Sequence, residues 1–116
     1  MSSYVEKIKD GEWDIYLTRG DYFATTVSMV SKATGEPITP TDGSLRFAVK
    51  KRYKDPDAKI LINKQIPLDS MLLELESADT KSLAFGDYDY DVEYTDALGR
   101  PDTFIEGKLK LTKEVY

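Results

Sequence analysis

Gly86–Thr95 alternates strictly between acidic and apolar side chains, and this alternation restricts the fold more than any other feature of the sequence. The apolar positions are Tyr88, Tyr90, Val92 and Tyr94, and the acidic positions are Asp87, Asp89, Asp91 and Glu93. Side chains of a β-strand point alternately to the two faces of a sheet, whereas those of a helix return to one face after about 3.6 residues. The pattern therefore predicts a β-strand with one buried face and one face in water.

Alternation of the same kind recurs along the rest of the chain. It predicts strands over 12–18, 22–31, 44–51, 59–66 and 103–112, and a short strand or helical turn at 72–76. A single helical turn is expected within 77–83, with Asp79 or Thr80 as its N-cap. Gly, Pro and Asp turn signals separate these segments at intervals of about 8–12 residues, as in a sandwich or a barrel. We therefore expect an all-β fold.

The last two predicted strands form a hairpin, and the sequence suggests its register. Residues that oppose each other must lie on the same face of the sheet. The expected pairs are Tyr94 with Ile105, Val92 with Gly107, Tyr90 with Leu109, Asp91 with Lys108 and Asp89 with Lys110. A slip of one residue would put acids opposite leucines, so we expect this register to hold.

Size and charge limit the possible functions. The chain has 116 residues and a mass of 13.1 kDa, which predicts one domain, 1–116, with 1–10 as a flexible or edge-adding segment. Its 41% hydrophobic and 32% charged residues are typical of a globular domain, and no apolar run is long enough to span a membrane. A net charge of −5 argues against nucleic-acid binding, because phosphate contacts need clustered cations. The basic run 50–54 is flanked by Asp55 and Asp57, so we interpret it as a solvated strand end.

The sequence contains no cysteine and no histidine. Disulfides and thiolate metal ligands are therefore excluded, and the commonest general base and the strongest nucleophile of enzymes are missing. A carboxylate pair could in principle serve glycoside hydrolysis, but nothing singles out a pair among the 21 acidic residues. We expect a protein without enzymatic activity, cofactor or bound metal. The amino terminus lacks the apolar stretch of a signal peptide, which argues against Sec-type export and favours a cytoplasmic location.

Two local motifs allow both a functional and a structural interpretation. The acidic face of 87–93 could bind calcium, but carboxylates two residues apart on a strand lie about 7 Å from each other. The lysines expected on the neighbouring strand favour a charge-paired, solvated face instead. Arg19-Gly20-Asp21 matches an integrin-binding tripeptide, and the alternative is a tight turn in which Gly20 has a positive φ. We favour the structural interpretation of both motifs.

Aromatic side chains suggest a possible carbohydrate site, because flat rings can stack on sugars. Tyr88, Tyr90 and Tyr94 alternate with acids, however, and Trp13 lies on the apolar face of the first predicted strand, so we expect all four in the core. The remaining tyrosines are scattered: Tyr4, Tyr16, Tyr22, Tyr53 and Tyr116. A carbohydrate- or surface-binding module therefore stays open as the alternative function.

The segment Leu83-x-x-Gly86-x-Tyr88-x-Tyr90 resembles the tyrosine corner of immunoglobulin-like domains. The resemblance implies an immunoglobulin-like antiparallel β-sandwich of about seven strands. Tyr88 would donate its hydroxyl to the backbone just upstream, and Tyr90 would occupy the place of the second cysteine of antibody domains. Phe47 would stand where those domains have a tryptophan.

A second resemblance covers most of the chain. The motifs are Leu17-Thr18-Arg19-Gly20-Asp21, Gly35-Glu36-Pro37-Ile38, Phe47-Ala48-Val49-Lys50 and Thr80-x-x-Leu83-x-x-Gly86-Asp87-Tyr88-x-Tyr90-Asp91-Val92, followed by Thr103 and Gly107. In this order they are similar to small β-sandwich domains of phage and prophage tail or baseplate proteins, such as the amino-terminal domain of baseplate upper proteins. The resemblance implies a virion structural protein whose partners are other virion proteins or further copies of itself.

Assembly of such a protein would use strand edges and loops. Tyr4, Val5 and Ile8 near the amino terminus, and Val115 and Tyr116 at the carboxy terminus, have few apolar neighbours in sequence and could add a strand to another protein. The alternative is that both segments fray.

Overall fold

The computed structural model describes residues 3–31 and 33–113, which form an all-β fold. The strands are β1 (Tyr4–Lys9), β2 (Glu12–Thr18), β3 (Phe23–Thr26), β4 (Met29–Val30), β5 (Pro37–Ile38), β6 (Ser44–Lys50), β7 (Ile62–Ile66), β8 (Leu72–Leu75), β9 (Gly86–Thr95) and β10 (Pro101–Thr112). Within this part of the chain, the helical elements are a 3₁₀ turn, η1 (Asp57–Lys59), and a short helix, α1 (Ser77–Lys81). The expected fold class is confirmed.

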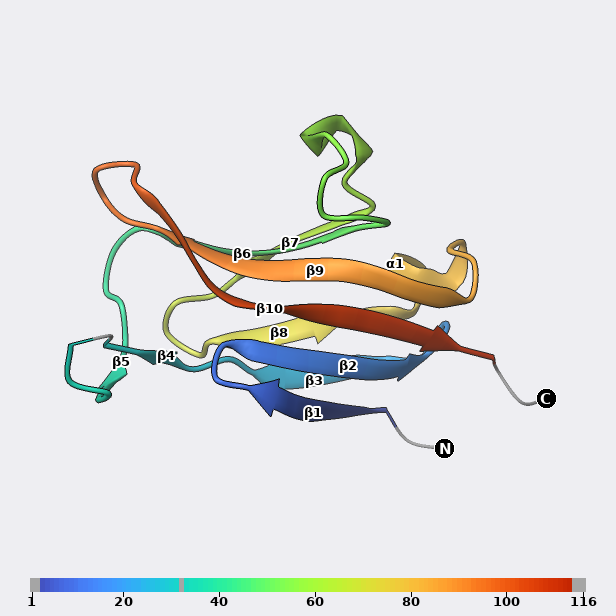
Figure 1. The fold of residues 1–116 in the computed structure, drawn as a ribbon, viewed down its shortest axis with the longest axis horizontal. Coiled ribbons are helices and arrows are strands. Elements are labelled where there is room, and N and C mark those ends of the chain that lie inside the picture. Colours follow the sequence, from blue (N-terminus) through green and yellow to red (C-terminus); the bar gives the residue numbers. More distant parts are fainter. Residues whose placement is uncertain (1–2, 32, 114–116) are drawn as a thin grey trace.

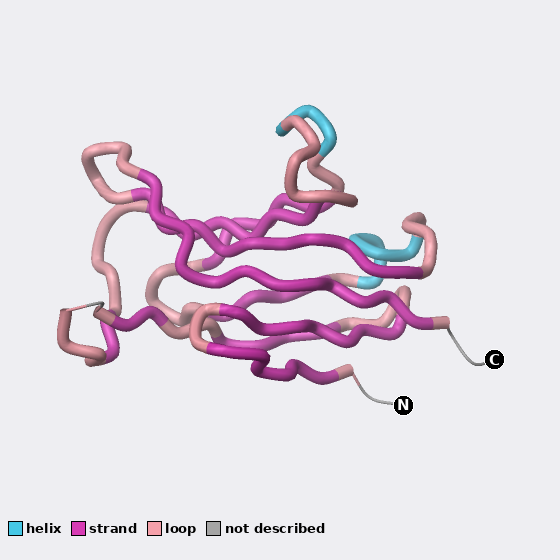
Figure 2. Tube along the Cα trace, in the orientation of Figure 1, coloured by secondary structure: helices cyan, strands magenta, loops and turns pink. Residues whose placement is uncertain are grey.

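The strands are arranged in two layers (Figures 1 and 2). One layer is a six-stranded sheet in the order β1-β2-β10-β9-β6-β7, and the other contains the two-stranded sheet β3–β8. The hairpin β4–β5 extends beyond one end of the sandwich (Figure 1). Immunoglobulin-like domains pack strands C, F and G against strands B and E, and β6, β9 and β10 face β3 and β8 in the same way. The sandwich is therefore immunoglobulin-like.

The strand count exceeds the expected value of about seven. The predicted strand 22–31 is divided into β3 and β4, because β8 pairs with residues 23–26, whereas Met29 and Val30 pair with β5. Residues 4–9 are not a free segment but form β1, which pairs with β2 through Val5 and Ile15 among others. The predicted strands at 12–18 and 86–95 have the expected bounds.

One strand pair is parallel and departs from the antiparallel arrangement of the other paired strands. β2 runs parallel to β10, with Ile15 beside Leu109 and Leu17 beside Leu111. A parallel neighbour needs a long connection. Here the connection between the two strands contains β3 to β9. Alternation within each strand gives no information about this direction, because it is the same for either neighbour.

The β9–β10 register differs by two residues from the expected one. The observed pairs are Val92 with Ile105, Tyr90 with Gly107, Tyr88 with Leu109, Asp89 with Lys108 and Asp87 with Lys110. The hairpin loop is shorter than expected because Thr95 already pairs with Pro101, and an irregularity between Thr103 and Ile105 displaces the remaining pairs. A shift of two residues keeps every side chain on its expected face, so the face criterion could not exclude it.

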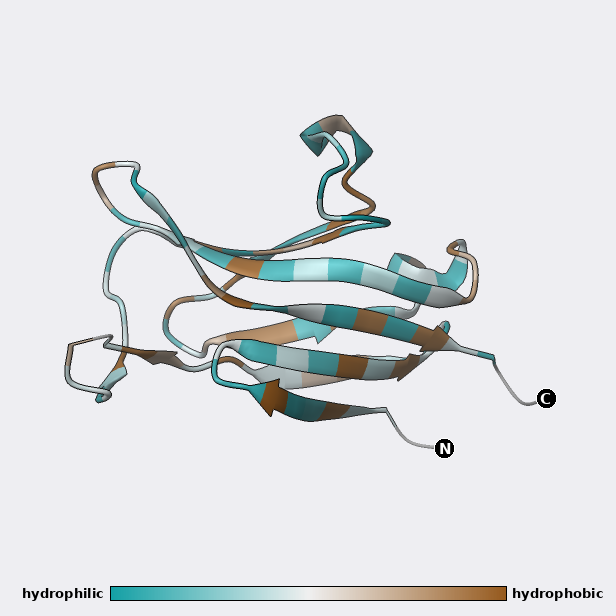
Figure 3. Cartoon of the chain, viewed as in Figure 1, coloured by the Kyte–Doolittle hydropathy of each residue, from teal (hydrophilic) through white to brown (hydrophobic). Residues whose placement is uncertain are grey.

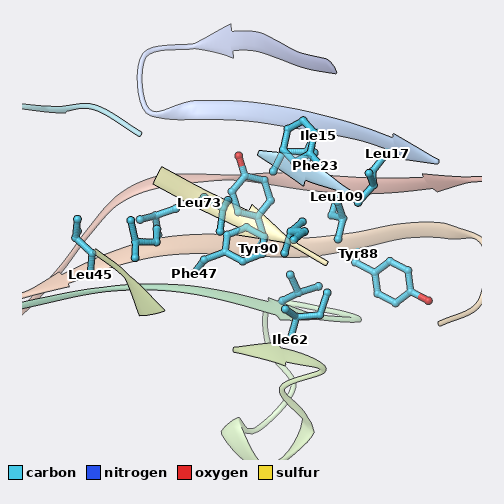
Figure 4. Close-up of a cluster of buried hydrophobic side chains, with 14 of the residues drawn as sticks. Ile15, Leu17, Phe23, Leu45, Phe47, Ile62, Leu73, Tyr88, Tyr90 and Leu109 are labelled. Carbon is cyan, nitrogen blue, oxygen red and sulfur yellow. The ribbon is translucent and has the colours of Figure 1, made fainter. Parts of the chain in front are cut away.

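The core lies between the two layers and is built from the apolar positions of the alternating strands (Figures 3 and 4). Phe47 is fully buried, and its ring centroid lies 5.2 Å from that of Tyr90. The Tyr88 hydroxyl donates a hydrogen bond of 2.7 Å to the Ala84 carbonyl, as expected for a tyrosine corner. The positions that the resemblance assigned to Phe47, Tyr88 and Tyr90 are therefore core positions.

Trp13 and Tyr94 do not lie as deep as expected. Trp13 is only partly buried, outside the core cluster, because it lies one residue from the start of β2, and Lys7 Nζ is 5.8 Å from its ring centroid. Its carbonyl oxygen accepts a hydrogen bond from the Tyr90 hydroxyl. Tyr94 is partly buried against the core, and its hydroxyl donates to the Asp42 carbonyl at 2.8 Å.

Helix α1 is capped one turn earlier than expected. Glu76, not Asp79 or Thr80, is the N-cap, and Asp79 accepts a hydrogen bond of 2.7 Å from the Glu76 backbone in a capping box. Thr80 is fully buried inside the helix, and its hydroxyl accepts a 2.9 Å hydrogen bond from the Gly20 backbone N–H. The helix therefore holds the β2–β3 turn in place.

Candidate interaction surfaces

Strand β1 forms one edge of the six-stranded sheet (Figure 1). Within residues 3–31 and 33–113, its hydrogen-bonded neighbour is β2, and its other side faces no strand. Val5 is half-buried and packs against the core, whereas Tyr4 and Ile8 are 44% and 48% exposed. Three of the residues expected at an assembly edge thus lie on this edge strand, and Val115 and Tyr116 lie outside the described residues.

The β1 edge is closed in part by its own side chains. The Tyr4 ring stacks on Tyr16 with 4.5 Å between centroids and 10° between planes. The pairing with β2 is irregular between Lys7 and Lys9, and both lysines are exposed. A bulge and charged side chains on an edge strand oppose pairing with another chain. The open backbone of β1 is therefore most accessible before Lys7.

The outer face of the six-stranded sheet carries a ladder of opposite charges. Lys108 Nζ lies 2.8 Å from Asp89 Oδ1, and a side-chain hydrogen bond to Asp89 raises the Lys108 pKa. Arg46 lies 3.6 Å from Glu93 on the neighbouring strand. No cluster that could hold a metal ion exists among the described His, Cys, Asp and Glu residues. Of the two ion pairs expected between β9 and β10, neither forms as expected: Lys108 pairs with Asp89 in place of Asp91, and Lys110 Nζ lies 3.8 Å from Asp14 on β2.

The loop between β6 and β7 folds back over this face through Tyr53. The Tyr53 hydroxyl lies 3.0 Å from Glu106 Oε2 on β10. The backbone N–H of Tyr53 donates a hydrogen bond of 3.0 Å to Asp89 Oδ2. Burial and the bond to Glu106 raise the pKa of this hydroxyl. Lys50 Nζ, at the start of the loop, binds Asp57 at 2.9 Å. These contacts attach the loop to the sheet beside an open depression of about 360 Å³, which Lys50, Tyr53 and Asp57 help to line.

Asp91 is the least satisfied charged group in this depression. It opposes Ala48 on β6 and Glu106 on β10, so neither neighbouring strand places a lysine against it. Its Oδ1 atom is buried and has no hydrogen-bond partner among the described residues. Burial raises the pKa of the Asp91 carboxyl, and the Arg46 guanidinium opposes this shift. The depression is negative overall, because its charged lining consists of two cations, Arg46 and Lys50, and four acids, Asp57, Asp89, Asp91 and Glu93.

Sequence reasoning did not identify Tyr53 or Asp91 as members of one site. Tyr53 was grouped with scattered tyrosines, and Asp91 was expected opposite Lys108. The basic run 50–54 across from four acids on β9 was the available signal, because opposite charges on neighbouring elements attract. Recognising that no lysine opposes Asp91 would have required the correct register of β10 against β9.

The remaining predicted structural residues lie at turns beside the tyrosine corner. Gly20 has φ +84°, as expected for a tight turn at Arg19-Gly20-Asp21. Leu83 packs against the core, and its carbonyl accepts a 3.1 Å hydrogen bond from Arg19. Gly86 begins β9 with φ +129°, a backbone conformation that side chains with a Cβ rarely adopt. These residues shape one end of the sandwich.

No helix within residues 3–31 and 33–113 is both long enough and apolar enough to cross a membrane.

Comparison with known proteins yields structural neighbours only. No protein-family model matches the chain, and no curated protein matches it. Fibronectin(III)-like modules of Clostridium thermocellum CbhA align over 97% of this chain and 100% of theirs, with 11% identity and a TM-score of 0.49. CopC from Methylosinus trichosporium OB3b aligns over 98% of this chain and 99% of its own, with 11% identity and a TM-score of 0.38. At these values neither neighbour bears on the function of this chain.

Proposed function

We propose that this chain is a non-enzymatic structural protein of a phage or prophage virion, a tail or baseplate component that works through protein–protein assembly. The observation that carries the proposal is that both layers of the sandwich end in strands with an open side among the described residues. Backbone N–H and C=O groups at such an edge can pair with a strand of another chain.

The ordered motifs of the sequence support the same proposal. Gly20, Leu83, Gly86 and Tyr88, which carry much of the resemblance to phage baseplate domains, all build one end of the sandwich. Their positions are structural, so they account for a shared scaffold. Contacts with partners would then come from the edges and loops around that scaffold, as in other proteins that bind by strand addition.

A carbohydrate-binding module receives less support from the exposed aromatic side chains. Sugar stacking needs a ring face that is open to solvent. Tyr4 and Tyr16 cover one face of each other, and Lys110 Nζ lies 5.1 Å from the Tyr16 centroid. Tyr53 is held to the sheet by its hydrogen bonds. None of these three side chains therefore combines with a second ring to form an open surface on which a sugar could stack.

Immunogold electron microscopy tests the virion assignment directly. An antibody against this chain would be applied to phage particles released by the strain that encodes it. We expect gold at one defined position on the tail, at or near the baseplate. Particles that carry no label, while the antibody detects the free protein in the same lysate, would contradict the assignment.

A further inference from the structure

The second layer has an edge whose backbone hydrogen-bonding groups can be assigned residue by residue. β3 pairs with β8 in antiparallel register, with Thr25 opposite Leu73. The Val27 N–H donates to the Met71 carbonyl at 2.8 Å, which continues this ladder. Because hydrogen-bonded pairs alternate along an antiparallel ladder, the residues between them point their N–H and C=O groups the other way. The backbone groups of Ala24 and Thr26 therefore point away from β8.

This edge belongs to an unusually uncharged part of the chain. Residues 22–31 contain no charged residue, proline or glycine, although 32% of all residues are charged. Exposure alternates along the segment, and Tyr22, Ala24, Thr26, Ser28 and Val30 are exposed. After Leu98, Val30 and Tyr22 are the most exposed large hydrophobic residues of the described chain, at 58% and 56%. Neutral segments of high β-propensity are those that pair readily with other strands.

The two edges of the six-stranded sheet differ from β3 in this respect. β1 carries Glu6, Lys7 and Lys9 and has an irregular pairing between the two lysines. β7 carries Lys64, which lies 2.8 Å from Asp79. Charged side chains and bulges are the usual means by which edge strands avoid pairing with other chains. β3 carries neither, so it is the least protected of these edges.

We propose that two copies of this chain pair through β3, antiparallel and about a two-fold axis. The β3–β8 sheet of one copy then continues into that of the second. This inference rests on the proposed function, because it names the edge and the partner through which the chain assembles. A two-fold contact brings the same surface from both copies together. The second copy offers the same outward N–H and C=O groups of Ala24 and Thr26.

A second copy suits this edge because the segment is compatible with itself. Antiparallel pairing of an uncharged strand with its own copy brings no like charges together, whereas directly opposed like charges destabilise a sheet. A β1–β1 contact centred on Glu6 would oppose two carboxylates. Pairing at β3 would also bring a neighbouring chain next to Tyr22 and Val30, which stand at the ends of the uncharged segment.

Complementary charge variants at the edge test the proposal. The double variants Ala24→Lys/Thr26→Lys and Ala24→Glu/Thr26→Glu place two like charges on the exposed side of β3. Ala24 opposes Glu74 within the same sheet, so the lysine variant has an acidic neighbour and should fold. The matched control is Asn63→Lys/Gln65→Lys, which adds the same charge at exposed positions of β7.

Solution mass by light scattering is the readout, with folding checked by near-ultraviolet circular dichroism. We expect the wild type and the β7 control to reach twice the chain mass of 13.1 kDa as concentration rises. Each β3 variant alone should stay monomeric over at least a tenfold wider concentration range. A mixture of the lysine and glutamate variants should recover the dimer, because opposite charges then face each other. That recovery cannot come from a variant that fails to fold.

Two results would overturn the β3 pairing. A wild-type oligomer that both β3 variants leave unchanged would place the contact elsewhere and leave the assembly function standing. A wild type that is monomeric at every concentration would also exclude the pairing, and the gold label on virions would then decide the proposed function separately.

Discussion

Lys108 lies opposite Asp89 across the β9–β10 hairpin, with 2.8 Å between Lys108 Nζ and Asp89 Oδ1. Asp91, two residues farther along β9, opposes Glu106 instead. This register assigns one carboxylate a cationic partner and leaves the other without one. It therefore makes different predictions for two aspartates that look equivalent in the sequence.

A double-mutant cycle measures which aspartate is coupled to Lys108. We expect Asp89→Asn and Lys108→Met to show a coupling energy of about 0.2–1 kcal/mol in urea unfolding, the range of partly exposed ion pairs. The same cycle with Asp91→Asn should show no coupling beyond experimental error. The opposite result, with coupling only to Asp91, would restore the register expected from the sequence.

Removing the charge of Asp91 should stabilise the protein near neutral pH. Burial raises the folded-state pKa above its ordinary value of 3.8, so the folded chain binds more protons than the unfolded chain between the two values. The Asp91 charge therefore lowers stability above this window and has no such effect below it.

The expected result for Asp91→Asn is a higher free energy of unfolding than wild type near pH 7, with a difference that disappears as the pH falls below about 4. Asp89→Asn is the matched control and should be destabilised near pH 7, because Asp89 accepts hydrogen bonds from Lys108 and from the Tyr53 backbone. Loss of stability in Asp91→Asn at neutral pH would show that its carboxylate has a favourable partner.

The tyrosine corner can be tested by deleting one oxygen. Tyr88→Phe keeps the buried ring but leaves the Ala84 carbonyl without its hydrogen bond. We expect a loss of about 0.5–1.5 kcal/mol in the free energy of unfolding, the net contribution of a typical intramolecular hydrogen bond. Tyr22→Phe removes an exposed hydroxyl that binds Glu74 and serves as the control, with no measurable loss. Equal effects of the two variants would contradict a structural role for the corner.

Gly107 should tolerate no side chain. A Cβ at this position would lie 1.9 Å from the Trp13 carbonyl oxygen and 2.7 Å from its carbon, in the parallel β2–β10 pair. Relief requires a backbone shift, so Gly107→Ala should cost more than about 3 kcal/mol or prevent folding. Gly99→Ala is the control, since nothing lies within 4 Å of its added Cβ, although its φ of +82° carries some strain. A variant at 107 as stable as the one at 99 would contradict the close approach of β2 and β10.

Much of this fold could be predicted from the sequence because alternation reports the face of each side chain. Alternation places Tyr88 and Tyr90 in the core, whereas the position of Phe47 and the hydrogen bond of Tyr88 follow from the resemblance to immunoglobulin-like domains. Alternation is insensitive to a shift of two residues, so it could not give the register that separates Asp89 from Asp91. Nor does it report strand direction, which is why the parallel pairing of β2 with β10 was not foreseen.

The candidate surfaces depend more strongly on tertiary structure. Tyr53 has no local pattern, and its role arises from a loop that crosses to Glu106 on β10. The sequence predicts one strand over 22–31, because alternation and a high content of β-branched and aromatic residues continue through the whole segment. Its division into β3 and β4 results from the short length of β8, a property of the partner strand. The open edge of β3 likewise follows from which strands pair, not from its own residues.

The central structural claim is that this chain assembles with copies of itself, and its mass in solution tests that claim most directly. Light scattering of the purified chain over a wide concentration range should show a transition from 13.1 kDa to a discrete oligomer. The mass should level off at twice the chain mass and should not grow further, because a two-fold contact closes on itself. A constant 13.1 kDa at every concentration would contradict self-assembly.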